Sequence, residues 1–328
     1  MNILILCDNS GNDDEGMKKI SRKIGLQLNK NNKCKVKLAS LKEVLFNLQD
    51  YKNIDIIHSL SGPTFKTFIY IYLIKKMLNE KPKTIISMIH PHWNIFSHMI
   101  FHIFKPDSIM TFSPKWDLFF KKFKIQKSSF SVMGFDQTKF FKVDSNSKKL
   151  LRKKLNLPLD KKIILHVGHL NKGRNLQVFN SLKNNKSLYP LIIGSTTVSH
   201  DKDLVNELKN GNINIIDTYL PSIDEYYKAA DCYLFPTINP RSCIQVPLSV
   251  IEALACGIPI ISSKFEGLPF YFDQGYNIRY LNSFHNINDE IKNILSNDDI
   301  YNNGINEFSW TNISKKMLEF YSKLTDVK

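Results

Sequence analysis

The sequence predicts an α/β protein made of two doubly wound domains, each with a parallel sheet. Three observations lead to this prediction. The 328 residues are too many for one typical core and fit two domains of about 150 residues each. Short apolar runs such as Ile3–Leu6 and Ile163–Val167 alternate with segments of helical periodicity, as expected when strands are buried on both faces. Glycine follows such runs at Gly168 and Gly194, where doubly wound sheets bind ligands.

The composition is that of a folded chain, with 43% hydrophobic and 12% aromatic residues. It contains no charge-free apolar run of about 18 residues, so we expect no membrane-spanning helix. The N-terminal run MNILILCDNS lacks a basic segment, and we interpret it as a buried strand rather than a signal peptide. The five cysteines form no CxxC pair, so we expect reduced cytoplasmic thiols and no metal site.

The net charge of +15 is concentrated in the first half of the chain. Residues 1–150 hold 25 Lys/Arg against 12 Asp/Glu, whereas residues 151–328 hold 20 against 18. A basic half suggests an anionic partner, such as a membrane surface, a nucleic acid or an acidic substrate. A Lys- and Asn-rich bias without a specific partner is an equally open alternative. No nucleic-acid-binding motif is present, so we expect no nucleic-acid partner.

Strands and helices are predicted to alternate through the first half. The apolar runs that we interpret as strands are Ile3–Leu6, Val36–Ala39, Ile54–Ile57, Thr84–Ile89 and Ser108–Phe112. The first is followed by a polar loop and, from Gly16, by a segment of helical periodicity. His58 and His90 end two of these runs, at the edge where a ligand would bind. For His90 a site role and a structural role are both open, whereas for His58 we favour a structural role.

Three stretches combine aromatic and apolar residues with flanking lysines, as do helices that lie on anionic bilayers. We interpret Phe65–Leu78 and Trp93–Lys105 as core helices, with a bilayer surface as the alternative. For Lys115–Lys127 we favour surface contact with a membrane or an acceptor.

The polar run after Val143 is predicted to separate the two domains. We place the first domain at residues 1–145 and the second at 146–310. A C-terminal helix, residues 311–328, could cross back to the first domain.

The second domain opens with a strand and a basic loop that suit an anion. Gly168, His169, Lys172 and Arg174 lie between the strand ending at Val167 and a helix predicted from Leu176. Glycine permits close backbone approach, a helix N-terminus offers free N–H groups, and arginine donates a fork of hydrogen bonds to phosphate. We favour phosphate binding over an unspecialised basic turn. The loop lacks the GxxxxGK[ST] pattern of a Walker A motif.

The stretch from Ser242 to Ser263 is predicted to be a loop, a helix and a strand. The helix, Leu248–Cys256, ends at Gly257, and Pro259 follows as a stop signal. Glu252 lies inside this apolar helix. Because an unpaired buried carboxylate is costly, either a protein donor or the hydroxyl groups of a ligand must satisfy it.

These segments together resemble the family 4 retaining glycosyltransferases, which have the GT-B fold of two facing Rossmann-like domains with a cleft between them. The matching segments are GFDQTKF from Gly134, GHLNKGRN from Gly168, YYKAADCYLFP from Tyr226, PLSVIEALACGIPII from Pro247 and FEGLP from Phe265. The segment from Pro247 is the most specific, and the others are persuasive through their order along nearly the whole chain.

The resemblance implies roles for residues at matching positions. Glu252 matches the second glutamate of the family's Glu-x7-Glu pair and would bind the ribose of a nucleotide. Ile244 occupies the position of the first glutamate, and Gln245 is the nearest group that could replace it. His169 stands at the family's arginine and Arg174 at its lysine. Lys172 could substitute if the loop is shifted.

Further positions follow from the same resemblance. His90 would lie near the transferred sugar, and Gly16 would border the acceptor and the diphosphate. The remaining residues expected to contact the nucleotide-sugar are Gly168, Gly194, Pro247, Leu248 and Ser249.

The activity that the resemblance implies is transfer of a sugar from a nucleotide-diphosphate sugar to a hydroxyl acceptor, with retention of configuration. His90, Arg174 and Lys172 would be the catalytic residues, with neither a metal nor another cofactor. The basic first domain favours a lipid-linked or envelope glycan acceptor and an anionic membrane surface. The protein would be cytoplasmic and peripheral at the inner face of the cell membrane. A non-catalytic GT-B-like binding or scaffold protein is the alternative, suggested by Ile244 and His169.

Overall fold

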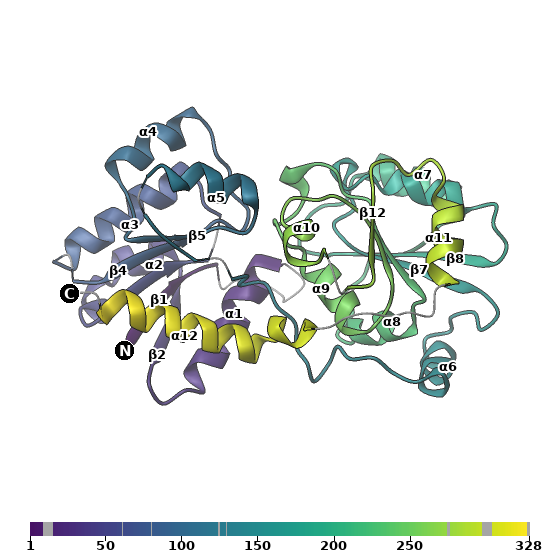
Figure 1. Ribbon diagram of the computed structural model, residues 1–328, viewed down its shortest axis with the longest axis horizontal. Helices are drawn as coiled ribbons and strands as arrows, with labels where there is room; N and C mark the ends of the chain where they lie inside the picture. The colour runs from purple at the N-terminus through teal and green to yellow at the C-terminus, as the bar shows by residue number, and fades with distance from the viewer. Residues whose placement is uncertain are drawn as a thin grey trace. The chain divides into compact units, whose positions relative to one another are not determined.

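The computed structural model describes residues 1–8, 16–60, 62–79, 81–123, 125–128, 130–273, 276–296 and 304–326 (Figure 1). The chain forms two compact units. Unit 1 comprises Met1–Met133, Ile244–Val246 and Trp310–Lys328, and unit 2 comprises Gly134–Cys243 and Pro247–Ser309. The units divide at Met133 rather than near residue 145. The Phe135 N–H donates to Phe308 O at 3.0 Å, which joins this segment to the end of unit 2.

Unit 1 is built on a six-stranded parallel sheet with the order β2-β1-β3-β4-β5-β6. Its strands are β1 (Asn2–Leu6), β2 (Lys35–Ala39), β3 (Ile56–Ser59), β4 (Lys83–Ser87), β5 (Ser108–Met110) and β6 (Gln126–Ser128). Its helices are α1 (Gly16–Asn29), α2 (Leu41–Phe46), η1 (Leu48–Tyr51), α3 (Phe65–Met77), α4 (Ile95–Ile103), α5 (Pro114–Lys121) and α12 (Trp310–Asp326).

Successive side chains of β1 point to opposite faces of the sheet, so this strand contributes to a hydrophobic core on each face. Leu4 and Leu6 pack into the cluster that α2, α3, α4 and α5 cover. Ile3 and Ile5 are equally buried and, by the two-residue period of a strand, face the other way. Helix α12 packs beside α1 (Figure 1).

His58 joins α12 to the sheet of unit 1. The ring is fully buried, with Nδ1 at 2.6 Å from the Tyr321 hydroxyl and Nε2 at 2.7 Å from Ser87 Oγ. Burial lowers the pKa of His58 to about 3, so the imidazole is neutral at ordinary pH. The structural role favoured for this residue is confirmed.

Unit 2 contains a second six-stranded parallel sheet, with the order β12-β11-β10-β7-β8-β9. Its strands are β7 (Lys162–Gly168), β8 (Leu188–Gly194), β9 (Asn214–Ile216), β10 (Cys232–Phe235), β11 (Ile260–Ser263) and β12 (Ile278–Leu281). Its helices are α6 (Ser145–Lys154), α7 (Lys202–Asn210), α8 (Ile223–Ala229), α9 (Leu248–Ala255), α10 (Leu268–Tyr271) and α11 (Ile287–Leu295). Short 3₁₀ helices are η2 (Lys172–Arg174), η3 (Leu176–Leu182), η4 (Pro240–Ser242) and η5 (Ile305–Phe308).

The expected helix from Leu176 is a 3₁₀ segment, η3, instead of an α-helix. Asn175 before it has a left-handed backbone with φ of 55°, and the segment continues into an asparagine-rich stretch. Asparagine side chains compete for backbone hydrogen bonds and disfavour helix interiors. The basic loop therefore lacks the α-helical N-terminus that was expected to contribute N–H donors.

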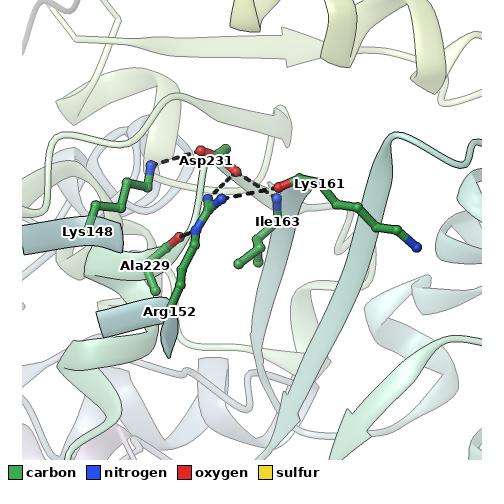
Figure 2. Close-up of polar contacts among 6 residues, drawn as sticks. All are labelled: Lys148, Arg152, Lys161, Ile163, Ala229 and Asp231. Atoms are coloured by element: carbon green, nitrogen blue, oxygen red, sulfur yellow. Dashed lines mark hydrogen bonds and ion pairs between the residues drawn. The ribbon is translucent and has the colours of Figure 1, made fainter. Parts of the chain in front are cut away.

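Asp231 fastens α6 to the sheet of unit 2 (Figure 2). Its carboxylate accepts from Lys148 Nζ at 2.9 Å, from Arg152, and from the Ile163 N–H at 2.7 Å. Arg152 also donates to Ala229 O at 2.9 Å and to Lys161 O at 3.2 Å. A buried ion pair is tolerated when hydrogen bonds of this kind satisfy both partners.

The sheet order of unit 2 predicts where a ligand would bind. The chain leaves β7 for β8 on one side, and β10 pairs with the other side of β7. Doubly wound sheets bind ligands at such a reversal, outside the carboxyl ends of the strands. In unit 1 the corresponding reversal lies between β1 and β3. Within the described residues, no helix is long and apolar enough to cross a membrane.

Candidate functional site

Arg174 links the two loops that flank the reversal point of unit 2. Its side chain is 5% exposed, and Nε donates to Ser242 O at 2.9 Å, from η2 to η4. The guanidinium lies over the Phe235 ring, 6.0 Å from its centroid. The hydrogen bond to Ser242 O uses one N–H group of the guanidinium and fixes the orientation of this group. Its other N–H donors are available to an anion.

Two glycines make the contact between Arg174 and the loop of Ser242 possible. A Cβ atom on Gly168 would lie 2.9 Å from Nη1 of Arg174, and one on Gly173 would lie 1.8 Å from Ser242 Oγ. Real Cβ atoms do not approach other atoms so closely. Glycine is therefore required at Gly173 for the two loops to meet, and at Gly168 for the guanidinium to sit at the strand end.

For the transferase reaction that the resemblance implies, replacing Gly168 with alanine is expected to reduce activity more than stability. The new methyl group would meet the far end of the flexible Arg174 side chain, which can move away without disturbing the core. We expect an activity loss of about tenfold to a hundredfold, because small misplacement of a charge-stabilising donor is costly. Steady-state kinetics and thermal melting of the variant would test this. A melting temperature that fell with unchanged activity would contradict it.

His166, which the sequence reasoning missed, lies behind Arg174. The ring is fully buried, and its Nδ1 lies 2.9 Å from Leu234 O. Burial, and then the charge of Arg174, lower the pKa of His166 to about 3. The imidazole is therefore neutral, and with Nδ1 donating to the carbonyl its Nε2 is an acceptor. The signal in the sequence was a histidine inside the otherwise apolar run Ile163–Val167.

Lys172 and His169 occupy different environments from Arg174. Lys172 is largely exposed, and its Nζ lies 3.9 Å from Asp201 Oδ2. Asp201 is the N-cap of α7 and accepts from the Leu204 N–H at 3.1 Å. His169 is half-buried. Arg174 is thus the fixed cation of the loop, whereas Lys172 is a long, largely exposed side chain beside Asp201.

Gly194 ends β8 as Gly168 ends β7, so two neighbouring strands of the sheet both end in glycine. It pairs in register with Gly168, and a Cβ on it would lie 2.9 Å from Leu170 Cδ1. His200 Nε2 lies 2.9 Å from Ser195 O and orders the loop that follows. Strands β7 and β8 therefore both end in glycine, which lets the side chains of Arg174 and Leu170 lie directly against the backbone.

Glu252 lies on α9, the helix that follows the loop after β10. Its side chain is 4% exposed. Burial, and then the nearby charges of Tyr233 and Glu252, raise the pKa of Tyr227 well above its ordinary value. The carboxylate therefore lies close to a phenol of α8, which is one of the protein groups that could satisfy it.

Tyr233 connects β10 to the end of β7. Its hydroxyl donates to Val167 O at 3.1 Å and accepts from the Val167 N–H at 3.3 Å. Pro247 is the N-cap of α9, Leu248 is buried and Ser249 is half-buried. The residues predicted around the nucleotide in unit 2 thus come from strand ends, from the loops that follow them or from the helix after one such loop.

The segment Ile244–Val246 belongs to unit 1, although its neighbours in the chain belong to unit 2. The Gln245 N–H donates to Ile89 O at 2.9 Å, and Nε2 of the same residue donates to Met88 O at 2.8 Å. Ile244 is buried. The amide N–H groups of Gln245 are therefore directed at the backbone after β4, and the apolar Ile244 supplies no carboxylate.

His90 follows β4 in the same part of unit 1. It is half-buried, its N–H donates to Gly62 O at 2.9 Å, and its ring centroid lies 4.9 Å from that of His92. Gly16 begins α1, and the preceding residues 9–15 lie outside the described part. The structure thus brings His90 and Gln245 to one strand end of unit 1.

Among the described residues, no group of three or more His, Cys, Asp or Glu side chains could hold a metal ion. The cationic and N–H donors at the end of β7 are suited to an anion.

The second half of the chain matches a family of transferases. Residues 147–307 match the family model described as Glycosyl transferases group 1. The chain is 24% identical over 164 residues to the putative teichuronic acid biosynthesis glycosyltransferase TuaC of Bacillus subtilis (strain 168). That alignment covers 45% of this chain and only 39% of TuaC.

Solved structures share the fold over nearly the whole chain. HepE from Anabaena in complex with UDP-glucose aligns with a TM-score of 0.76 at 14% identity, covering 98% of this chain and 100% of HepE. Sucrose-phosphate synthase from Thermosynechococcus elongatus aligns with a TM-score of 0.74 at 15% identity, covering 100% of both chains. Both likenesses confirm the GT-B class of fold, with two Rossmann-like units.

Proposed function

We propose, from the group 1 glycosyl transferases domain at residues 147–307, that this protein transfers a sugar from a nucleotide-diphosphate sugar to a hydroxyl acceptor. The observation that carries the proposal is the Arg174 side chain, held by Ser242 O at a glycine-lined strand end. An anionic ligand at this edge would meet a preorganised guanidinium. HepE was crystallised with UDP-glucose, which supports a nucleotide-sugar as the donor class.

Arg174 would hold the diphosphate of the donor. As the bond between the anomeric carbon and the diphosphate oxygen breaks, negative charge develops on that oxygen. Preorganised cationic donors stabilise such charge without reorganisation at the moment of reaction. Lys172, exposed on the same loop, could add a second cation when the donor binds. These two side chains supply the charge that the departing nucleoside diphosphate requires, and the proposal includes no metal.

Glu252 would bind the ribose of the donor. A carboxylate can accept from both vicinal hydroxyls of a ribose. Its position on α9, directly after the loop that contacts Arg174 through Ser242, is consistent with this role.

The acceptor would be bound by unit 1. In the proposed reaction the acceptor oxygen bonds to the anomeric carbon on the face that the diphosphate leaves, so that configuration is retained, and the acceptor proton passes to the departing phosphate. His90 would contact the transferred sugar, and the buried Oε1 of Gln245, with no partner among the described residues, is a nearby acceptor. The charge of residues 1–150 supports a lipid-linked or envelope glycan at the inner face of the cell membrane.

A panel of UDP-, GDP- and ADP-sugars tests the proposal, with donor hydrolysis or transfer as the readout. We expect turnover of at least one donor by the wild-type chain. Glu252→Ala should lower kcat/KM for that donor by about tenfold to a hundredfold, because hydrogen bonds to a charged group are worth about 1.5–3 kcal/mol.

Glu207→Ala is the matched control, since Glu207 is an exposed carboxylate on α7. Its kinetics should equal those of the wild type. Absence of turnover with every donor would favour the alternative, a non-catalytic scaffold with an apolar Ile244 where the family has a glutamate.

A further inference from the structure

Helix α4 of unit 1 carries an apolar stripe on the side turned away from the core. Phe101 is fully buried, whereas Phe96, Met99 and Ile103 are 61%, 59% and 70% exposed. These three residues are spaced i, i+3 and i+7, which places them on one face of a helix. The interpretation of Trp93–Lys105 as a core helix therefore holds for the inner face of α4, while the outer face is also apolar.

Helix α5 packs against α4 (Figure 1), and it also carries an exposed apolar side chain. Aromatic side chains of the two helices pack against each other. The ring centroids of His98 and Phe119 are 5.8 Å apart, and those of Phe101 and Phe120 are 5.1 Å apart. Trp116 and Phe120 are buried on the inner face of α5, whereas Leu118 is 72% exposed. Exposed apolar side chains of this size on adjoining helices indicate an interaction site.

A cationic cavity lies between these helices. It has a volume of about 410 Å³ and is lined by His98, His102, Lys105, Lys122 and Phe123. The ammonium groups of Lys122 and Lys105 lie 5.2 Å and 5.9 Å from the Phe123 ring centroid. The ring thus holds both charges at the cavity through cation–π contacts. Every polar side chain that lines the cavity carries an N–H donor, and no carboxylate lines it.

The two carboxylates of segment 93–127 are engaged elsewhere. Asp107 accepts from Lys75 Nζ at 2.7 Å, and Asp117 accepts from Lys127 Nζ at 2.7 Å. Neither lines the cavity. The positive charge at the cavity is therefore not neutralised by these acids, and its complement is an anionic group.

We propose that Phe96, Met99, Ile103, Leu118 and the cavity between α4 and α5 form a docking surface for an anionic phospholipid bilayer. The phosphate of a lipid headgroup occupies the cavity between Lys105 and Lys122, and the four apolar side chains enter the region between headgroups and acyl chains. An apolar face beside clustered lysines is the arrangement that binds such interfaces. The surface belongs to unit 1 alone, so the inference does not depend on the proposed reaction.

Vesicle co-sedimentation of the full chain, without any nucleotide-sugar, tests the inference. The vesicles are phosphatidylcholine alone or phosphatidylcholine mixed with phosphatidylglycerol, at low and high salt. We expect binding to the mixed vesicles that weakens with salt. The double variant Lys105→Ala/Lys122→Ala should bind about tenfold or more weakly, since each lysine near an anionic surface contributes roughly a fivefold factor. The double variant Phe96→Ser/Ile103→Ser should also bind the vesicles about tenfold or more weakly, and it should lose the binding that persists at high salt.

The matched control is Lys30→Ala/Lys33→Ala, which removes two exposed lysines of unit 1 outside this surface. Its binding should stay within about twofold of the wild type. All substituted side chains are solvent-accessible, so thermal melting should be unchanged and will confirm that the variants fold. Failure of the wild type to bind mixed vesicles at low salt would overturn the inference. Equal losses in the lysine variant and its control would also overturn it, as would binding of inorganic phosphate without vesicle binding.

Discussion

Replacing Arg174 with alanine is expected to lower kcat/KM for nucleotide-sugar turnover by about two to three orders of magnitude, the usual cost of removing one preorganised donor from developing charge. The side chain is buried, hydrogen-bonded to Ser242 O and placed over Phe235. Its loss would remove the fixed cation at the end of β7 and leave the exposed Lys172 as the cation of the loop. Steady-state kinetics with the preferred donor measure the effect.

Two further variants separate a charge effect from a packing effect. Arg174→Lys keeps the charge but not the planar fork, so it should recover only part of the lost activity. Arg279→Ala removes a half-exposed arginine of β12, on the outer strand of the sheet, and should leave kinetics unchanged. If Arg174→Ala retained wild-type kcat/KM while remaining folded, Arg174 would not bind the diphosphate.

Replacing Asp231 with asparagine is expected to lower the free energy of unfolding by about 3 kcal/mol, as when one partner of a buried pair is removed. The change would leave Arg152 and Lys148 without a buried counter-charge and weaken the attachment of α6 (Figure 2). Chemical denaturation followed by circular dichroism measures the loss. The exposed Asp160→Asn is the control and should change stability by less than about 0.5 kcal/mol. Equal stabilities for the two variants would contradict the role assigned to Asp231.

The pH dependence of this contribution has a definite sign. Burial alone would raise the pKa of Asp231, but the charge and hydrogen bond of Lys148 and the Ile163 N–H outweigh it, so the pKa is lowered on folding. The stabilisation is therefore present above the ordinary aspartate pKa and is lost as the pH falls through the lowered value.

Most of the fold could be predicted because its signals are local. Continuous apolar runs such as Ile3–Leu6 became buried strands, and glycines at Gly168 and Gly194 ended two of them. The region after Asn175 was less predictable. Its left-handed backbone and short 3₁₀ turns depend on contacts with η4, in particular the approach of Gly173 to Ser242, which lies far away in the sequence.

The candidate site was predictable only in part, for the same reason. Arg174 stood out as a cation after a glycine-ended strand, but its bond to Ser242 O joins residues 68 positions apart. His166 resembled an ordinary member of an apolar strand, and its position behind Arg174 depends on the pairing of β7 with β10. The membership of Ile244–Val246 in unit 1 could not be read from the sequence, because the segment lies within residues 147–307, which match the family model.

We propose that unit 2 binds a nucleotide through its ribose at Glu252 and its diphosphate at Arg174. Calorimetric titration with UDP, GDP and ADP, each compared with its 2′,3′-dideoxy form, tests it most directly. We predict that the wild type binds one ribonucleotide at least tenfold more tightly than its dideoxy form, and that Glu252→Ala binds both forms alike, because hydrogen bonds to the carboxylate carry the preference. A preference that survived in Glu252→Ala, or no binding of any nucleoside diphosphate by the wild type, would contradict the claim.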